Sequence, residues 1–168
     1  MLIRFSATNH ASLRERQELT LVAQRGYSTL ATQAIPGLHH EVLPAAGIYG
    51  ANASGKSNLI HALAFMRSAV LSSHQRWLPE QRIPRQPFRF DSHSHREPSV
   101  FEVEFTSQRQ RYRYGFACSS TEIQEEWLYA HPTVKQRLLY YRDADSAMKF
   151  GPSLAGPKKA VESMTRPN

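Results

Sequence analysis

Residues 45–59 read AAGIYGANASGKSNL and carry the most informative pattern in the chain. The run 50–57 satisfies G-x-x-x-x-G-K-[ST], the pattern of a P-loop, which requires a strand before it and a helix after it. The small, mostly apolar run 45–49 predicts a buried strand that leads into the loop. Apolar spacing of three and four residues then predicts a helix over 56–72. The residues of its expected stripe are Leu59, Ile60, Leu63, Met66, Arg67 and Val70.

In a P-loop the backbone N–H groups point toward phosphates and the positive end of the helix dipole assists them. Gly50 and Gly55 would allow the turn and the close approach. Lys56 would reach the β and γ phosphates, and the Ser57 hydroxyl would enter a Mg²⁺ shell. We therefore expect ATP and Mg²⁺ as cofactors, with Ser57 as the metal ligand. The expected nucleotide-binding residues are Gly50, Ala51, Asn52, Ala53, Ser54, Gly55, Lys56, Ser57 and Asn58.

Composition is that of one soluble domain of 168 residues, with 40% apolar and 21% charged residues. The sequence contains no long apolar run that would predict a signal peptide or a membrane span. Its single cysteine, Cys118, is consistent with a reducing compartment. We expect a cytoplasmic protein. The net charge of +7 favours a phosphate-bearing partner, with nucleic acid as one possibility.

The other segments divide the chain by pattern. Residues 2–7 and 18–22 predict a hairpin, followed by a long loop over 23–43. The segment 73–99 is basic and contains Pro79, Pro84 and Pro87, which exclude a continuous helix. From residue 100 the apolar period is two, which predicts a β meander over 100–150 with strands near 101–105, 112–116, 123–129 and 137–141. The tail 151–168 contains three prolines and predicts no closing element.

Several stretches resemble bacterial AAA-type ATP-binding proteins of the ABC, SMC and OLD group. The loop GANASGKSNL and the opening LIRFSATNHASLRERQELTLVA carry the resemblance, although His10 stands where an aromatic residue is usual after Asn9. Further along, IPRQPFRFD, FEVEF, RYRYGF and EEWLY are similar to one OLD-like family. The resemblance implies an α/β P-loop NTPase fold, specifically an ABC-type head lobe with a mixed sheet and an antiparallel β meander. It also implies a homodimer in the full-length form, with DNA or a partner nuclease as partner and a role in DNA transactions or phage defence.

Hydrolysis needs a Walker B acid as well as the loop. The nearest pattern, Leu138 to Asp143, is interrupted by Arg142 and favours a plain strand; the run 153–158 contains Pro157, which disfavours an ABC signature. Residues 1–168 therefore resemble a single partial head domain that ends before the signature and Walker B, and no catalytic residue is assigned. The alternatives are a non-catalytic nucleotide-binding or interaction fragment and, less favoured, a small-molecule kinase.

Other clusters favour structural roles. His93, His95, His74 and the pair at 39 and 40 lack a fixed third ligand for a metal site. Glu125 and Glu126 are adjacent on a strand, so they point to opposite faces and do not form an acid and base pair. Between Arg111 and Tyr114, arginines alternate with tyrosines, which favours buried rings and solvated arginines over base stacking. Cys118 is in step with the aromatic face and is expected to be buried.

Overall fold

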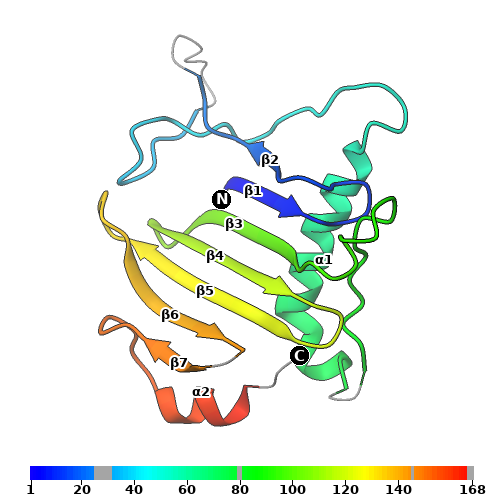
Figure 1. Cartoon of the computed structure of the whole chain (residues 1–168). Coiled ribbons are helices and arrows are strands. Elements are labelled where there is room, and N and C mark those ends of the chain that lie inside the picture. The colour runs from blue at the N-terminus through cyan, green and yellow to red at the C-terminus, as the bar shows by residue number, and fades with distance from the viewer. Residues whose placement is uncertain (25–31, 79–80, 145, 166–168) are drawn as a thin grey trace.

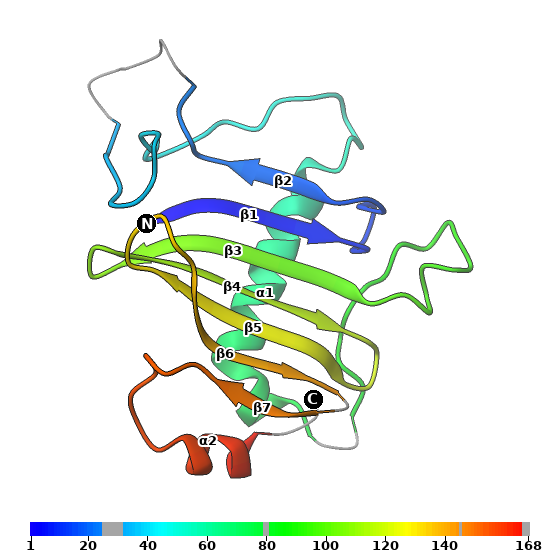
Figure 2. The same cartoon turned by 60° about the vertical axis from the view of Figure 1, so that its left-hand side comes forward.

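The computed structural model describes residues 1–24, 32–78, 81–144 and 146–165. Seven strands form one sheet in the order β2-β1-β3-β4-β5-β6-β7, and every neighbouring pair is antiparallel. The strands are β1 (Leu2–Thr8), β2 (Gln17–Thr20), β3 (Ser99–Ser107), β4 (Gln110–Cys118), β5 (Ile123–His131), β6 (Arg137–Asp143) and β7 (Ser146–Phe150). The long helix α1 (Lys56–Arg76) lies across one face of this sheet, and the other face carries no helix (Figures 1 and 2).

The β meander expected over 100–150 is present, and it contains one strand more than the sequence predicted. β3 and β4 pair along their full lengths, from Ser99 opposite Cys118 to Ser107 opposite Gln110. β7 was missed because its residues SAMKF lack a two-residue apolar period. The sheet differs from the expected mixed sheet, since all the strand pairs of the described residues are antiparallel.

The predicted strand over 45–49 is wrong for the described structure. Strand-like pairing of this segment stops at Val42, which bridges Val22 and Gln33, and at Leu43, whose N–H donates to the Leu21 carbonyl at 2.7 Å. Residues 45–49 are exposed and belong to no strand. An apolar run becomes a strand only when a neighbouring strand supplies hydrogen-bond partners, and none of the described strands lies beside this segment.

The helix α1 is longer than predicted, and only part of the predicted stripe faces the sheet: Met66 is buried, and Leu59 and Leu63 pack against the core. It extends to Arg76, and its buried residues are Ala62, Met66 and Ala69. Ile60 and Val70, which the sequence placed on the stripe, are 49% and 54% exposed. Small residues at 62 and 69 let the helix approach the strands closely, a preference that apolar periodicity alone does not reveal.

The main core lies between α1 and strands β1, β3 and β4. Phe5, Phe101 and Phe116 are buried at its centre, and Phe65 of α1 packs against Phe101 with ring centroids 5.0 Å apart. A second, smaller core forms where the segment after β2 folds back on β1, and it contains Ile3, Leu21, Ile35 and Val42. β1 contributes residues to both cores.

The tail also differs from its prediction, because a short helix, α2 (Lys158–Met164), follows β7. It has no buried residue, and Lys158 anchors its start by donating to the Gly151 carbonyl at 3.1 Å. Pro79 and Pro167 lie outside the described residues. Within the described residues, neither helix combines the length and the apolar character that crossing a bilayer requires.

Candidate nucleotide-binding loop

Residues 50–57 form a loop that enters α1 directly. Gly55 is the N-cap, with φ of 92°, a left-handed conformation that suits glycine. A Cβ at Gly55 would lie 3.1 Å from the Ser12 hydroxyl oxygen, and one at Gly50 would lie 3.1 Å from the Ser54 hydroxyl oxygen. Both glycines therefore stand where the loop is tightly packed, as the motif predicts.

Lys56 reaches back across the loop. Its Nζ donates to the carbonyl oxygens of Gly50 at 2.7 Å and Ala51 at 2.5 Å, with the Ser54 hydroxyl at 3.5 Å. These contacts hold the ammonium group over the loop, on its solvent side, while the loop residues 50–54 remain exposed. The Lys56 ammonium group is thus held beside the loop backbone, where its charge can also attract an anion.

The N-terminus of α1 is available to an anion. No side chain caps it, and its first turn contains no acidic residue. The positive end of the helix dipole favours negative charge there, although the Asn58 N–H already donates to the Gly55 carbonyl at 3.0 Å. Ser57 is exposed in this first turn, so its hydroxyl can take part in a magnesium shell beside a bound phosphate.

The turn between β1 and β2 is hydrogen-bonded to the first turn of α1, a contact that the sequence did not predict. Asn58 donates from Nδ2 to the Ser12 hydroxyl at 2.6 Å. Asn58 is therefore a positioning residue that ties the first turn of α1 to the β1–β2 turn. No local sequence pattern predicts this contact, because Ser12 and Asn58 are 46 residues apart.

Asn9 connects that turn to the segment before β3. Its Nδ2 donates to the carbonyls of Ser94, Glu97 and Pro98, and its Oδ1 accepts from the Phe88 N–H at 2.9 Å. Asn9 has φ of 53°, a conformation that asparagine tolerates better than most residues. The Asn9 side-chain amide thus hydrogen-bonds four backbone groups of the segment 81–98.

His10 takes the place of an aromatic residue in the core. Its ring lies 5.7 Å from Phe65 and 5.3 Å from Phe101, centroid to centroid. It is 4% exposed, and burial, followed by the neighbouring His61, lowers the pKa of His10 below its ordinary 6.5. The departure at this position from the resembled family is therefore compatible with the same packing.

Arg85 holds the segment 81–98 through buried and partly buried hydrogen bonds. It is 8% exposed, and its guanidinium donates to the carbonyls of Glu97 at 2.6 Å and His95 at 2.8 Å and to the Ser120 hydroxyl at 3.2 Å. Burial lowers the pKa of Arg85 below its ordinary value. The sequence had given this arginine no role beyond the basic character of its segment.

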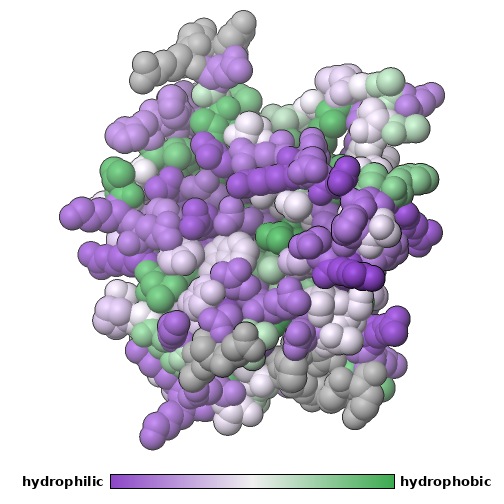
Figure 3. All heavy atoms as spheres, viewed as in Figure 1, coloured by the Kyte–Doolittle hydropathy of each residue, from purple (hydrophilic) through white to green (hydrophobic). Residues whose placement is uncertain are grey.

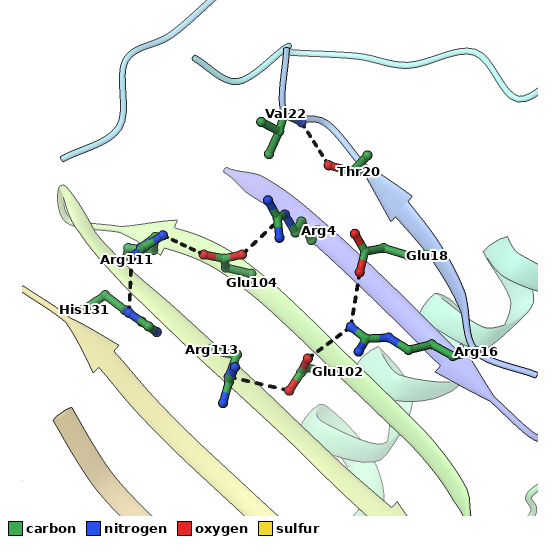
Figure 4. A network of polar contacts seen from close by, with 10 residues as sticks. All are labelled: Arg4, Arg16, Glu18, Thr20, Val22, Glu102, Glu104, Arg111, Arg113 and His131. Carbon is green, nitrogen blue, oxygen red and sulfur yellow. Dashed lines mark hydrogen bonds and ion pairs between the residues drawn. The ribbon is translucent and has the colours of Figure 1, made fainter. Parts of the chain in front are cut away.

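The face of the sheet opposite α1 carries the arginines of the Arg111–Tyr114 run in ion pairs (Figure 4). Arg111 contacts Glu104 at 3.0 Å and Arg113 contacts Glu102 at 3.6 Å, while Arg16 joins Glu102 to Glu18. Tyr112 and Tyr114 point the other way and pack on Phe105 and Phe116. The arginines and tyrosines lie on opposite faces as expected, but the predicted burial is wrong: Tyr112 and Tyr114 are half-buried, and the Arg111 side chain is only 9% exposed. Figure 3 shows the molecule from the side of this face, and most of the coloured surface is hydrophilic.

The remaining candidates lie away from the loop. Asp143 ends β6, which is separated from β1 by three strands, so the Leu138–Asp143 run belongs to the meander. Burial raises the pKa of the Cys118 thiol to about 12, which agrees with the buried residue predicted. Among the described residues, no group of three or more His, Cys, Asp or Glu side chains is placed to hold a metal ion.

Comparison with known proteins agrees with the loop geometry. A family model described as "AAA domain, putative AbiEii toxin, Type IV TA system" matches residues 45–153, more than half of the 168-residue chain. This match begins at the segment before the loop and extends beyond β7. No curated protein matches the chain significantly.

Proposed function

Because the chain belongs to this AAA-domain family of P-loop proteins, we propose that it binds ATP together with Mg²⁺ through residues 50–58. The observation that carries the proposal is the placement of Lys56, whose Nζ spans the Gly50 and Ala51 carbonyls beside the uncapped start of α1. Phosphates in this position would receive backbone N–H donors and an ammonium charge together.

Each loop residue has a separate task in this proposal. Lys56 would exchange carbonyl contacts for the β and γ phosphates, and Ser57 would hold Mg²⁺ through its hydroxyl. Asn58 would keep the first turn in place through Ser12. The bound Mg²⁺ would neutralise phosphate charge, and the chain's own residues would bind and orient the nucleotide.

Calorimetry with Mg²⁺-ATP tests the proposal. Wild-type protein should bind, Lys56→Ala should lose the heat of binding, and Lys135→Ala should bind like wild type, because Lys135 is an exposed lysine in the turn between β5 and β6. Binding that Lys56→Ala leaves unchanged would contradict the proposed site.

We further propose that the chain belongs to an ABC/OLD-like ATPase head that acts as a cytoplasmic homodimer in DNA transactions or phage defence. The β1–β2 turn and the antiparallel meander support this through the sequence resemblance.

A non-catalytic nucleotide-binding unit is the alternative, supported by the position of Asp143 away from the loop. Phosphate release measured alongside binding separates them: Lys56-dependent turnover supports the ATPase, and binding without turnover supports the alternative. Transfer of phosphate to an added acceptor would instead indicate the small-molecule kinase.

A further inference from the structure

A cavity of about 760 Å³ lies between α1 and the sheet, away from the phosphate-binding loop. The closest contacts of α1 are with β1 and β3, and the helix continues across the other strands of the sheet (Figure 2). Its walls come from the middle and end of α1 and from β1 and β3–β6, and they include Met66, Val70, Trp77, Phe105, Phe116 and Leu128.

The size and lining of this cavity resemble those of small-molecule sites. Such sites span roughly 300–1,000 Å³, with apolar walls and a few convergent polar groups. Apolar walls of this extent are unfavourable in contact with water. A ligand with an apolar body would remove them from solvent.

One polar cluster stands out on the apolar wall. The Glu126 carboxylate accepts hydrogen bonds from the hydroxyls of Tyr114 at 2.7 Å and Tyr140 at 2.5 Å, and it pairs with Arg142 at 2.7 Å. All four residues line the cavity. Burial and the nearby Glu126 raise the pKa of both tyrosines, so both hydroxyls keep their protons.

The direction of these bonds defines what a ligand could offer. Both phenolic protons point to Glu126, so each tyrosine oxygen can only accept a further hydrogen bond. Arg142 balances the charge of Glu126, which leaves little attraction for a cation. The cluster therefore matches a neutral group that donates a hydrogen bond, such as a hydroxyl or a ring N–H.

We propose that the cavity between α1 and the sheet binds a small, neutral molecule with an apolar body, whose donor group contacts the Glu126–Tyr114–Tyr140 cluster. The volume favours a small molecule over a helix of a partner protein. This site is separate from the proposed nucleotide site.

Titration calorimetry with 2-naphthol and 2-methoxynaphthalene on the full chain tests the proposal. The two probes share a ring system, but only 2-naphthol donates a hydrogen bond. We expect 2-naphthol to bind with one-to-one stoichiometry and roughly three- to tenfold more tightly than its ether, the range that one net hydrogen bond supplies. Equal affinities would overturn the proposed role of the cluster.

Two variants with a matched control locate the probe. Val70→Trp should fill the cavity from its rim and weaken 2-naphthol binding at least tenfold, whereas Ile60→Trp, at a similarly exposed position of α1 outside the cavity, should not. Tyr140→Phe should weaken 2-naphthol severalfold and leave the ether unchanged. Binding unaffected by Val70→Trp would overturn the site. A dimer that excludes 2-naphthol and that Val70→Trp dissociates would show that a second copy occupies the cavity instead.

Discussion

Gly55 combines a left-handed backbone with a close neighbour at the start of α1. The chain also contains Gly156, whose φ is 113° but whose missing Cβ faces open space. The two glycines share the backbone constraint, and only Gly55 adds the contact with Ser12.

Alanine substitutions at Gly55 and Gly156 should distinguish a loss of stability caused by backbone strain from a loss of nucleotide affinity caused by a shifted loop. Each should cost roughly 1–2 kcal/mol of unfolding free energy, because an L-residue is strained in this conformation. Gly55→Ala should in addition weaken Mg²⁺-ATP binding, since the loop must shift away from Ser12. Denaturant unfolding and calorimetry check this, and equal ATP affinity in both variants would count against the loop geometry.

His10 should make the protein less stable in mild acid. Its pKa is lowered in the folded state by burial, so below pH 6.5 the unfolded chain binds a proton that the native chain does not. Stability contributed by the neutral ring is therefore full above pH 6.5 and is lost as pH falls toward the folded pKa. His131 has a lowered pKa for the same first cause.

His10→Phe should flatten this acid dependence, because phenylalanine packs on Phe65 and Phe101 without titrating. Unfolding free energies at pH 7.5 and pH 5.5 provide the measurement. A slope identical to that of wild type would mean that His10 is protonated in the native state as readily as in the unfolded chain.

At the level of elements, the segment 81–98 is held by buried polar contacts and few apolar ones. Arg85 supplies donors to two carbonyls, and Asn9 supplies donors to three more. The Ala11 N–H also donates to the Gln86 carbonyl at 2.7 Å, and Arg14 pairs with Asp91 at 2.9 Å. Sequence patterns treat arginine as a surface residue, so this arrangement could not be predicted without the tertiary structure.

Removing the Arg85 guanidinium should therefore destabilise the protein. Arg85→Met removes the Arg85 donor from the His95 carbonyl and leaves the Glu97 carbonyl with Asn9 as its donor, and we expect a loss of about 2–4 kcal/mol. Arg82→Met is the matched control, since Arg82 is exposed, and it should change stability by less than about 0.5 kcal/mol. Thermal unfolding of the two variants decides between a buried anchor and a dispensable surface charge.

Local patterns predicted the elements that depend on local chemistry. The glycine loop and the helix after it follow from the spacing of Gly50, Gly55 and Lys56, and the paired strands β3 and β4 follow from a two-residue period. Residues 45–49 were misassigned because their composition suits a strand while their pairing depends on a distant neighbour. The helix α2, with seven residues, is too short for propensity to predict.

For the whole molecule, the sheet order predicts a gradient of stability. β1, β3, β4, β5 and β6 have neighbours on both sides, and β1, β3 and β4 supply buried residues to the main core, whereas β2 and β7 are edge strands. Amide hydrogen exchange should be slowest in β1, β3 and β4 and faster in β2, β7 and residues 45–49. Strong protection of residues 45–49 in the free chain would contradict their exposed, unpaired placement.

The most direct test of the central claim is an amide-resolved NMR titration of the 19.1 kDa chain with Mg²⁺-ATP and, separately, with adenosine. Phosphates bound by the loop should shift the N–H signals of residues 54–58 with ATP but not with adenosine, and Lys56→Ala should abolish these shifts. Shifts confined to other regions, or identical shifts with adenosine, would contradict a phosphate-binding role for the loop.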